Sequence, residues 1–372
     1  MKVAIAAIAG ALGGPRSYAR ELVRALTGLA GEDDFYVLTD DRAAWDDAGG
    51  EVMELPMRSS YTRPLWDHWK VPRALRSLDV DLFHHTKNVV PLFCPAKCVV
   101  TIHDLAPFLY PDTFTFLQGI HLRTHIRFAA RRADAVIAVS SNTRDDIIRH
   151  FHVPENRVRV VYNGVSPVFS RSPGDGELAG CRARYRLPGR FILYAGTIQP
   201  RKQVDMLIRV YHRLREEEGI PHHLVVAGRM GWKSGGLHET VRSLGLNDVV
   251  HFTGAVDGHD LPLIYRSAEV FVNPSLYEGF GLTCVEAMAC GTPVVASGVS
   301  SIPEVVGDAG LLFDPSDEES LFRALLTVIR EEGLRELLRQ KGIDRARKFS
   351  WEKAAAGTLE VYRSVLQNRG GA

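Results

Sequence analysis

Residues 275–286 read Ser-Leu-Tyr-Glu-Gly-Phe-Gly-Leu-Thr-Cys-Val-Glu. The two glycines let backbone N–H groups approach a ligand closely. The pattern predicts a helix from Leu282, and the N-terminus of a helix attracts an anion. Glu278 lies in the glycine loop, and Glu286 lies about one turn into the helix, where a carboxylate accepts hydrogen bonds from two sugar hydroxyls. The stretch therefore suits a ligand that carries both phosphate and sugar.

The composition indicates a globular chain with room for more than one domain. The chain has 372 residues, 45% of them apolar, and a formal net charge of +1. This balance gives no sign of a nucleic-acid-binding protein. The five cysteines are scattered and show neither a disulfide framework nor a zinc spacing. Together these features favour the reducing cytoplasm, with no nucleic-acid partner.

The apolar runs are too short to cross a membrane, because a span needs about 20 residues. The first eight residues, Met-Lys-Val-Ala-Ile-Ala-Ala-Ile, imitate a short signal peptide, but they carry one charge and run into Gly13-Gly14. We interpret them as a buried strand that feeds a glycine loop. Peripheral contact with the inner face of the membrane stays open at this stage.

Short apolar runs alternate with longer amphipathic runs along the whole chain, and this alternation predicts parallel sheets with crossover helices. The first series ends before residues 166–189, which hold several Pro and Gly turn signals. A second series follows, and residues 351–367 read as one last amphipathic helix. The predicted strands are 3–8, 35–39, 82–84, 98–102, 135–139, 158–161, 191–195, 224–227, 249–252, 270–272 and 294–296. The predicted helices before the last one are 15–29, 113–132, 142–150, 203–218, 237–244, 261–267, 282–289 and 319–330.

The notable polar and glycine-rich loops follow predicted strands. Open α/β sheets bind ligands beyond the carboxyl ends of their strands, so these loops are candidate ligand contacts. The loops contain Gly13-Gly14, His103-Asp104, Gly196 with Arg201-Lys202, and Glu278 to Leu282.

The ensemble of these motifs resembles the family 4 retaining glycosyltransferases, and the resemblance runs from Val3 to Trp351. The glutamate pair separated by seven residues in a glycine-rich setting is its main mark. The other matching pieces are Gly13-Gly14, His103-Asp104, Asn163-Gly164-Val165, Gly196 with Arg201-Lys202, Phe252-Thr253-Gly254 and Pro303-Glu304-Val305-Val306-Gly307.

The resemblance implies an α/β GT-B fold, in which two facing, doubly wound Rossmann-like domains hold the ligand in an interdomain cleft. Residues 1–166 would form the acceptor-binding domain and residues 167–350 the nucleotide-sugar-binding domain. Residues 351–372 would form a helix that crosses back to the first domain.

The resemblance also assigns roles to individual residues. Glu278 would lie beside the donor sugar, Glu286 would bind the ribose, and Arg201 with Lys202 would hold the diphosphate leaving group. The catalytic set would be Glu278, Arg201, Lys202 and His103. The donor-binding set would be Gly13, Gly14, Gly196, Val256, Leu261, Gly279, Phe280, Gly281, Leu282 and Glu286. Asp104 would lie on the acceptor side.

The implied reaction moves a hexose from a nucleoside-diphosphate sugar to a hydroxyl of a sugar or lipid-linked acceptor, with retention of the anomeric configuration. The run from His103 to Asp112 looks like mannosyl-type members, which makes GDP-mannose the first donor to test. A role in cell-surface polysaccharide or glycolipid synthesis follows from the same resemblance. No cofactor and no metal ion are expected, because Arg201 and Lys202 would neutralise the diphosphate.

Other interpretations of single motifs stay open. Asp79-Val80-Asp81 resembles the metal-binding pair of other glycosyltransferases, but it precedes a strand, so a surface turn is favoured. His121 and His125 are one turn apart, yet arginines crowd the segment and no carboxylate supports a metal there. Residues 61–70 mix aromatic and basic side chains, which suits a half-buried helix, an acceptor or a lipid headgroup.

Two other functions fit the same two-domain plan. One is a sugar phosphorylase or sugar-nucleotide epimerase, and the other is a protein that binds nucleotide sugars without turnover. Phosphate-dependent sugar release or epimerisation without an acceptor would identify the first, and tight donor binding without turnover the second.

Overall fold

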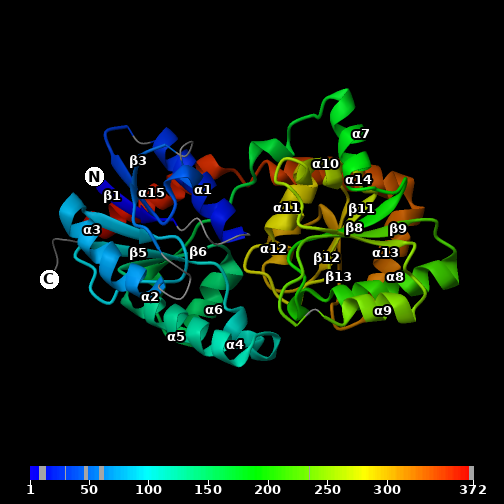
Figure 1. Cartoon of the computed structure of the whole chain (residues 1–372), viewed down its shortest axis with the longest axis horizontal. Coiled ribbons are helices and arrows are strands. Elements are labelled where there is room, and N and C mark those ends of the chain that lie inside the picture. The colour runs from blue at the N-terminus through cyan, green and yellow to red at the C-terminus, as the bar shows by residue number, and fades with distance from the viewer. Residues whose placement is uncertain (8–13, 30, 46–48, 58–62, 234, 368–372) are drawn as a thin grey trace. The chain divides into compact units, whose positions relative to one another are not determined.

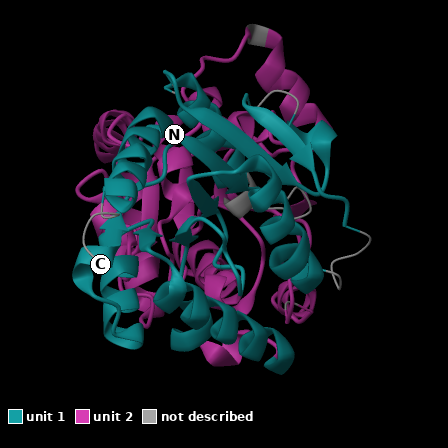
Figure 2. Cartoon of the chain, turned by 90° about the vertical axis from the view of Figure 1, so that its left-hand side faces the viewer, with its two compact units in different colours: residues 1–109, 116–164, 350–372 teal, residues 110–115, 165–349 magenta. Residues whose placement is uncertain are grey.

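The computed structural model describes residues 1–7, 14–29, 31–45, 49–57, 63–233 and 235–367 (Figure 1). The chain forms two compact units, coloured separately in Figure 2. The first contains residues 1–109, 116–164 and 350–372, and the second contains residues 110–115 and 165–349. The C-terminal segment therefore folds with the first unit, whereas residues 110–115 pack with the second.

A sheet of seven parallel strands forms the centre of the first unit. Its strand order reverses direction at β1, as in a Rossmann sheet. The order is β3 (Glu51–Glu54), β2 (Asp34–Thr39), β1 (Lys2–Ala6), β4 (Leu82–His85), β5 (Lys97–Ile102), β6 (Ala135–Ala138) and β7 (Val158–Val160). The helical elements are α1 (Gly14–Gly28), α2 (Arg63–Leu65), the π-helical turn η3 (Trp66–Lys70), α3 (Val71–Leu78), α4 (Ala106–Leu109), α5 (Phe116–Arg132), α6 (Ser141–Phe151) and α15 (Trp351–Gln367).

Helices cover both faces of this sheet because its strands are apolar on both sides. In β1, Val3 and Ile5 pack with α1 and α15, whereas Ala4 and Ala6 pack with α3, α5 and α6. Successive strand residues point to opposite faces, so one apolar run supplies two cores. The sheet is therefore buried on both faces, as the continuous apolar runs of the sequence predict.

A buried polar chain fastens α15 to the first sheet. His84 Nδ1 lies 2.6 Å from Tyr362 Oη, and His84 Nε2 lies 2.8 Å from Thr101 Oγ1. Tyr18 Oη lies 2.9 Å from the same Thr101 oxygen. Burial lowers the pKa of His84 to about 3, so its ring is neutral and serves as a hydrogen-bonding link.

The second unit repeats the plan with six parallel strands. Their order is β10 (Val250–Gly254), β9 (His223–Ala227), β8 (Phe191–Ala195), β11 (Val270–Asn273), β12 (Val294–Ser297) and β13 (Gly310–Phe313). The helices are α7 (Asp175–Arg184), α8 (Val204–Glu218), α9 (Leu237–Ser243), α10 (Leu261–Ser267), α11 (Leu282–Ala289), α12 (Ile302–Val306), α13 (Glu318–Arg330) and α14 (Glu332–Ala346).

Neighbouring loops at one edge of the second sheet belong to strands that pair in register. Phe271 of β11 pairs with Val294 of β12, and Asn273 pairs with Ala296. β8 pairs with β11 on the other side. The loops that follow β8, β11 and β12 therefore emerge next to one another, at the edge where α/β sheets bind ligands.

Some elements differ from the sequence predictions. The expected turn region 166–189 contains α7, in which Glu177 Oε2 accepts a hydrogen bond of 2.8 Å from Gly174 N–H and also pairs with Arg171. The edge strands β3 and β13 did not stand out as apolar runs. The last residue of the predicted strand 3–8 lies outside the described residues. No helix in the described part of the chain has the length and apolarity to span a bilayer.

Candidate active site

Three of the four residues predicted as catalytic meet in the second unit. Glu278 lies in the loop after β11, and Arg201 and Lys202 form the short turn η7 (Pro200–Lys202) after β8. Lys202 Nζ donates a hydrogen bond to Glu278 Oε1, and Arg201 Nη1 lies 3.7 Å from Glu278 Oε2. Two cations therefore flank one carboxylate at the carboxyl-terminal edge of the sheet.

The charges around Glu278 decide its protonation state. Burial alone would raise the pKa of this carboxyl group, but Lys202 and Arg201 outweigh burial and lower the pKa to about 2. Glu278 is therefore ionised at any physiological pH. The cluster of three groups keeps one net positive charge, which suits an anionic ligand.

Hydrogen bonds fix the positions of Arg201 and Glu278. Arg201 Nη1 donates to Tyr277 O, while Leu276 N–H donates to Arg201 O at 2.9 Å. Ser275 Oγ donates to Glu278 Oε1 at 2.8 Å. Arg201 is only 7% exposed, and its Nε is buried without a hydrogen-bond partner in the structure. A buried donor without a partner is costly, so Arg201 Nε is a candidate contact for a ligand oxygen.

Asn273 supports the same loop from the end of β11. Its Oδ1 accepts a hydrogen bond of 3.1 Å from Ser275 N–H, and its Nδ2 lies 3.5 Å from Glu278 Oε1. The sequence pattern does not single out Asn273 or Ser275, because uncharged polar residues at a strand end are common. Their position directly after a predicted strand was the available signal.

The glycine loop leads into α11 as the sequence predicts. Gly281 has a φ of +92°, and an added Cβ would lie 2.6 Å from Ile302 Cδ1, so the position requires glycine. Phe280 is buried and packs edge-on against Phe349, with ring centroids 5.5 Å apart. Gly279 precedes Phe280 in this loop, and Leu282 is the first residue of α11.

Glu286, in the middle of α11, has the opposite environment from Glu278. Among the described residues no ion pair involves its carboxyl group, and Tyr265 Oη donates to Glu286 Oε2 at 3.2 Å. Burial raises the pKa of Glu286 to about 8, and the hydrogen bond from Tyr265 offsets only part of that rise. A carboxyl group held in this way gains hydrogen bonds when a ligand supplies hydroxyl donors.

The other residues predicted to bind the donor lie on loops of the same sheet edge. Gly196 follows β8 with a φ of +147°, and its carbonyl oxygen would lie 1.9 Å from a Cβ added to Gly228. Val256 is half-buried in the loop after β10, and Leu261 begins α10. Within the described part of the chain, no hydrogen bond joins Val256 or Leu261 to Glu278.

His103, the fourth residue predicted as catalytic, belongs to the first unit and follows β5. Its Nε2 lies 2.8 Å from Thr86 O, so Nε2 carries the proton and Nδ1 keeps the lone pair. The ring meets Tyr18 edge-on, with centroids 4.8 Å apart. Burial lowers the pKa of His103, which makes the neutral ring the resting form.

The other predicted site residues of the first unit that the structure describes lie at the starts of helices. Asp104 Oδ1 accepts a hydrogen bond of 3.0 Å from Ala106 N–H and thereby starts α4. Gly14 is the first residue of α1, whereas Gly13 lies outside the described residues. The Asp104 side chain therefore stabilises the start of α4.

The alternative metal pairs have other partners. Asp81 Oδ2 accepts a hydrogen bond of 2.9 Å from Lys2 N–H at the amino end of β4, and Asp79 ends α3 with a φ of +49°. His121 and His125 face each other with centroids 4.1 Å apart, and His125 Nδ1 lies 2.8 Å from His121 O. Among the described residues, no cluster of three or more His, Cys, Asp or Glu side chains could hold a metal ion.

Comparison with known proteins places this geometry in a family. The family described as "Glycosyltransferase Family 4" matches residues 12–169, and "Glycosyl transferases group 1" matches residues 184–347. O-antigen chain mannosyltransferase B of Escherichia coli is 33% identical, over 76% of this chain and 74% of that protein. The serotype-specific mannosyltransferase WbdA of Escherichia coli is 30% identical over 74% of this chain, but the match spans only 34% of its own length.

Solved structures share the fold. Sucrose-phosphate synthase from Thermosynechococcus elongatus superimposes with a TM-score of 0.78 at 23% identity, covering 99% of both chains. HepE of Anabaena, solved with UDP and glucose, gives a TM-score of 0.79 at 20% identity, covering 98% of this chain and 100% of that chain.

The two Rossmann-like units and the matching family models define the protein as a glycosyltransferase with the GT-B fold, which confirms the predicted fold class. The chain belongs to glycosyltransferase family 4.

Proposed function

We propose that this enzyme transfers a hexose from a nucleoside-diphosphate sugar to an acceptor hydroxyl with retention of configuration. The observation that carries the proposal is the cluster of Arg201, Lys202 and Glu278 in the loops that precede α8 and α11, together with the half-buried Glu286 on α11. The cluster offers positive charge for a diphosphate, and Glu286 offers hydrogen-bond acceptors for a ribose. In this proposal the second domain binds the nucleotide, with Val256 and Leu261 near the base.

The cations act on the leaving group. When the bond between the sugar C1 and the diphosphate oxygen breaks, the diphosphate gains negative charge, and fixed cations stabilise it. Arg201 Nε is buried and has no other partner, so it is the group we assign to a phosphate oxygen. Because Arg201 and Lys202 supply this charge, the proposed reaction needs no metal ion and no cofactor.

In the proposed step the acceptor attacks the face that the diphosphate leaves, and this single displacement retains the configuration. The acceptor oxygen forms a bond to C1, the C1–phosphate oxygen bond breaks, and the acceptor proton passes to a departing phosphate oxygen. Glu278 is ionised and pairs with Lys202, so its role is to position the lysine and contact the sugar hydroxyls. His103 contributes a neutral ring with an acceptor Nδ1 on the acceptor side, beside Asp104.

The similar proteins guide the choice of substrate. The two Escherichia coli relatives are an O-antigen chain mannosyltransferase and a serotype-specific mannosyltransferase. We therefore propose a mannosyl donor, with GDP-mannose first, and a growing cell-surface polysaccharide or lipid-linked oligosaccharide as acceptor. The donor base and the linkage are part of this proposal.

A panel of nucleotide sugars tests the proposal. The protein is incubated with GDP-mannose, UDP-glucose and related donors in a chelator, with and without oligosaccharide acceptors, and the products are followed by NMR. We expect GDP-mannose to be consumed and a product with the donor's anomeric configuration to form. An inverted product, activity that requires an added divalent ion, or sugar release only with inorganic phosphate would each contradict the proposal.

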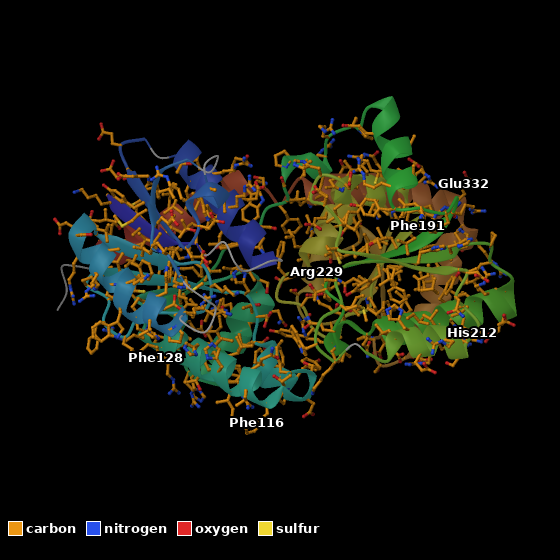
Figure 3. All side chains as sticks on the ribbon, in the orientation of Figure 1. Phe116, Phe128, Phe191, His212, Arg229 and Glu332 are labelled. Carbon is orange, nitrogen blue, oxygen red and sulfur yellow. The ribbon has the colours of Figure 1, made fainter. Side chains whose placement is uncertain are left out.

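Peripheral membrane contact is also part of the proposed function, and it rests on a surface of the first unit that we call the apolar–basic face. Phe116 and Leu117 on α5 are 78% and 77% exposed. The face consists of Leu65, Trp69, Leu92, Phe93, Phe116, Leu117, Ile120 and Phe128, all exposed, with Arg127, Arg131 and Arg132 on α5. Phe116 and Phe128 are labelled at the outer edge of the first unit in Figure 3.

The three segments of this face are in contact. The His68 ring stacks on His125 of α5 with centroids 6.3 Å apart, and His68 Nδ1 accepts a hydrogen bond of 3.3 Å from Leu92 N–H. α5 contains four arginines and no acidic residue. Exposed apolar side chains beside positive charge fit a membrane surface that contains anionic lipid.

Sedimentation with lipid vesicles tests the membrane contact. We expect the protein to bind vesicles rich in phosphatidylglycerol better than neutral vesicles, and the double variant Phe116→Ser with Leu117→Ser to bind several-fold less. Leu337→Ser on α14 removes a side chain that is 51% exposed in the second unit and serves as the matched control. Equal binding by the double variant and the control would contradict the contact.

A further inference from the structure

The loop after β12 holds the main chain of Glu278 from both sides. Glu278 N–H donates a hydrogen bond of 2.9 Å to Ser300 Oγ, and Ser301 Oγ donates a hydrogen bond of 2.9 Å to Glu278 O. Ser300 is half-buried and Ser301 is fully buried. The two serines therefore fix the peptide groups on either side of the Glu278 Cα atom.

Ser300 adopts a backbone conformation that serine disfavours. Its φ is +54°, in the left-handed region where the Cβ of most residues is strained and glycine is preferred. A serine at such a position needs a compensating interaction, and the hydrogen bond from Glu278 N–H supplies one. The Ser300 hydroxyl thus accepts a hydrogen bond that a glycine at this position could not accept.

Ser301 also departs from the local preference of its position. It is the residue before α12, where a serine side chain ordinarily accepts a hydrogen bond from the helix's first N–H groups. In this structure Ser301 makes no such cap, and its hydroxyl donates to Glu278 O. Ser300 therefore adopts a strained backbone and Ser301 does not cap α12, and both hydroxyls bond to the main chain of Glu278.

The paired strands explain why this contact is possible. Asn273 of β11 is in register with Ala296 of β12, so the two following loops start side by side. Ile302, the residue after Ser301, packs against Gly281 at the start of α11. The loop after β12 is thus held against the glycine loop at two places.

We infer that Ser300 and Ser301 are positioning residues that hold Glu278 at the sugar-contacting place, and the inference rests on the proposed role of Glu278. Ser275 and Lys202 orient the carboxylate, whereas Ser300 and Ser301 orient the main chain from which it extends. Without the serines, the carboxylate and its lysine partner move relative to the sugar.

Kinetics of two variants test this inference. Ser300→Gly removes the hydroxyl and the backbone strain together, so we expect an unchanged or higher unfolding temperature and a kcat lower by about tenfold to a hundredfold. Ser301→Ala should lower kcat similarly, and Ser301→Thr, which keeps the hydroxyl, should restore it. The Kd for the bare nucleoside diphosphate should not change, because Glu286 and the base contacts stay in place.

A matched control separates positioning from strain relief. Arg186 is exposed and has a similar φ of +51°, so Arg186→Gly relieves strain in the segment after α7 and leaves the loop after β12 unchanged. We expect wild-type kcat for Arg186→Gly. Wild-type kcat in Ser300→Gly and Ser301→Ala, or an equal loss of nucleoside diphosphate affinity in both, would overturn the positioning role.

Hydrogen exchange keeps the test independent of the proposed function. Exchange of the peptide that contains Glu278 N–H, followed by mass spectrometry, should speed up in Ser300→Gly and stay unchanged in Arg186→Gly. An unchanged exchange rate in Ser300→Gly would overturn the inference even if the wild type transferred no sugar. A wild type without transfer from any donor would contradict the proposed function instead.

Discussion

Two glutamates of one short stretch have opposite electrostatic environments. Glu278, in the loop before α11, lies beside Lys202 and Arg201, and its pKa falls to about 2. Glu286, on α11, accepts a hydrogen bond from Tyr265, and burial raises its pKa to about 8. Burial disfavours the charged form of both groups, so the neighbouring cations decide the difference. The loop after β8 therefore determines which of the two carboxyl groups is ionised.

Because their protonation states differ, Glu278 and Glu286 have different roles in the proposed function. Glu278 is always charged, so it can hold Lys202 in place and accept hydrogen bonds from the sugar. With a pKa of about 8, Glu286 is mostly protonated at neutral pH, and in the proposed function it should ionise when two ribose hydroxyls donate to it. Binding of the nucleotide should therefore release a proton from Glu286 and none from Glu278.

The largest expected effect comes from removing a cation that creates the contrast. Arg201→Ala should lower kcat by about 10²–10³-fold, or about 3–4 kcal/mol, because it removes charge that stabilises the leaving diphosphate. Steady-state kinetics with the identified donor measure this loss. Arg209→Ala, which removes a half-exposed arginine paired with Glu318 on the same domain, is the control. Unchanged kcat in Arg201→Ala would remove this assignment.

Glu286→Gln should make the enzyme more stable than the wild type as the pH rises. The folded pKa of Glu286 lies above that of an unfolded glutamate, so the folded wild type loses stability between about pH 4.5 and pH 8. Between pH 5 and pH 8, the free energy of unfolding should fall by about 3 kcal/mol less in the variant than in the wild type. Urea denaturation at several pH values measures it. Parallel pH profiles for the two proteins would contradict the raised pKa.

Glu278→Gln should change the acid side of the same profile by a smaller amount. The folded pKa of Glu278 lies below the unfolded value, so its stabilisation is present above about pH 4.5 and lost as the pH falls toward 2. Between pH 4.5 and pH 2.5, the free energy of unfolding should fall by about 2 kcal/mol less in the variant than in the wild type. Denaturation in acid measures this difference, and an identical acid limb would show that the cations do not act on Glu278.

Much of the fold could be predicted because the apolar pattern is continuous. The helices at 261–267, 282–289 and 351–367 have the predicted boundaries. The edge strand β3 was missed because it has only four residues, Glu-Val-Met-Glu, with two apolar residues between two glutamates. The helix α7 was missed because Gly174 and Gly176 disfavour a helix and resemble turn residues. The hydrogen bond from Gly174 N–H to Glu177 stabilises the start of this helix despite the glycines.

The candidate site was predictable where residues carry charge. Arg201 and Lys202 follow β8 and Glu278 follows the neighbouring strand β11, so their place after predicted strands indicated one sheet edge. Asn273, Tyr265 and the serines at 300 and 301 were missed, because their contacts depend on which loops become neighbours. The register of β11 with β12 supplies that information, and only the folded structure contains it.

Calorimetry of nucleoside diphosphate binding tests the central claim most directly. Titrations at pH 7 in two buffers with different ionisation enthalpies give the number of protons released on binding. The wild type should release close to one proton more than Glu286→Gln, because a group with a pKa of about 8 is mostly protonated before binding. Equal proton release in the two proteins, or no binding of any nucleoside diphosphate, would contradict the account.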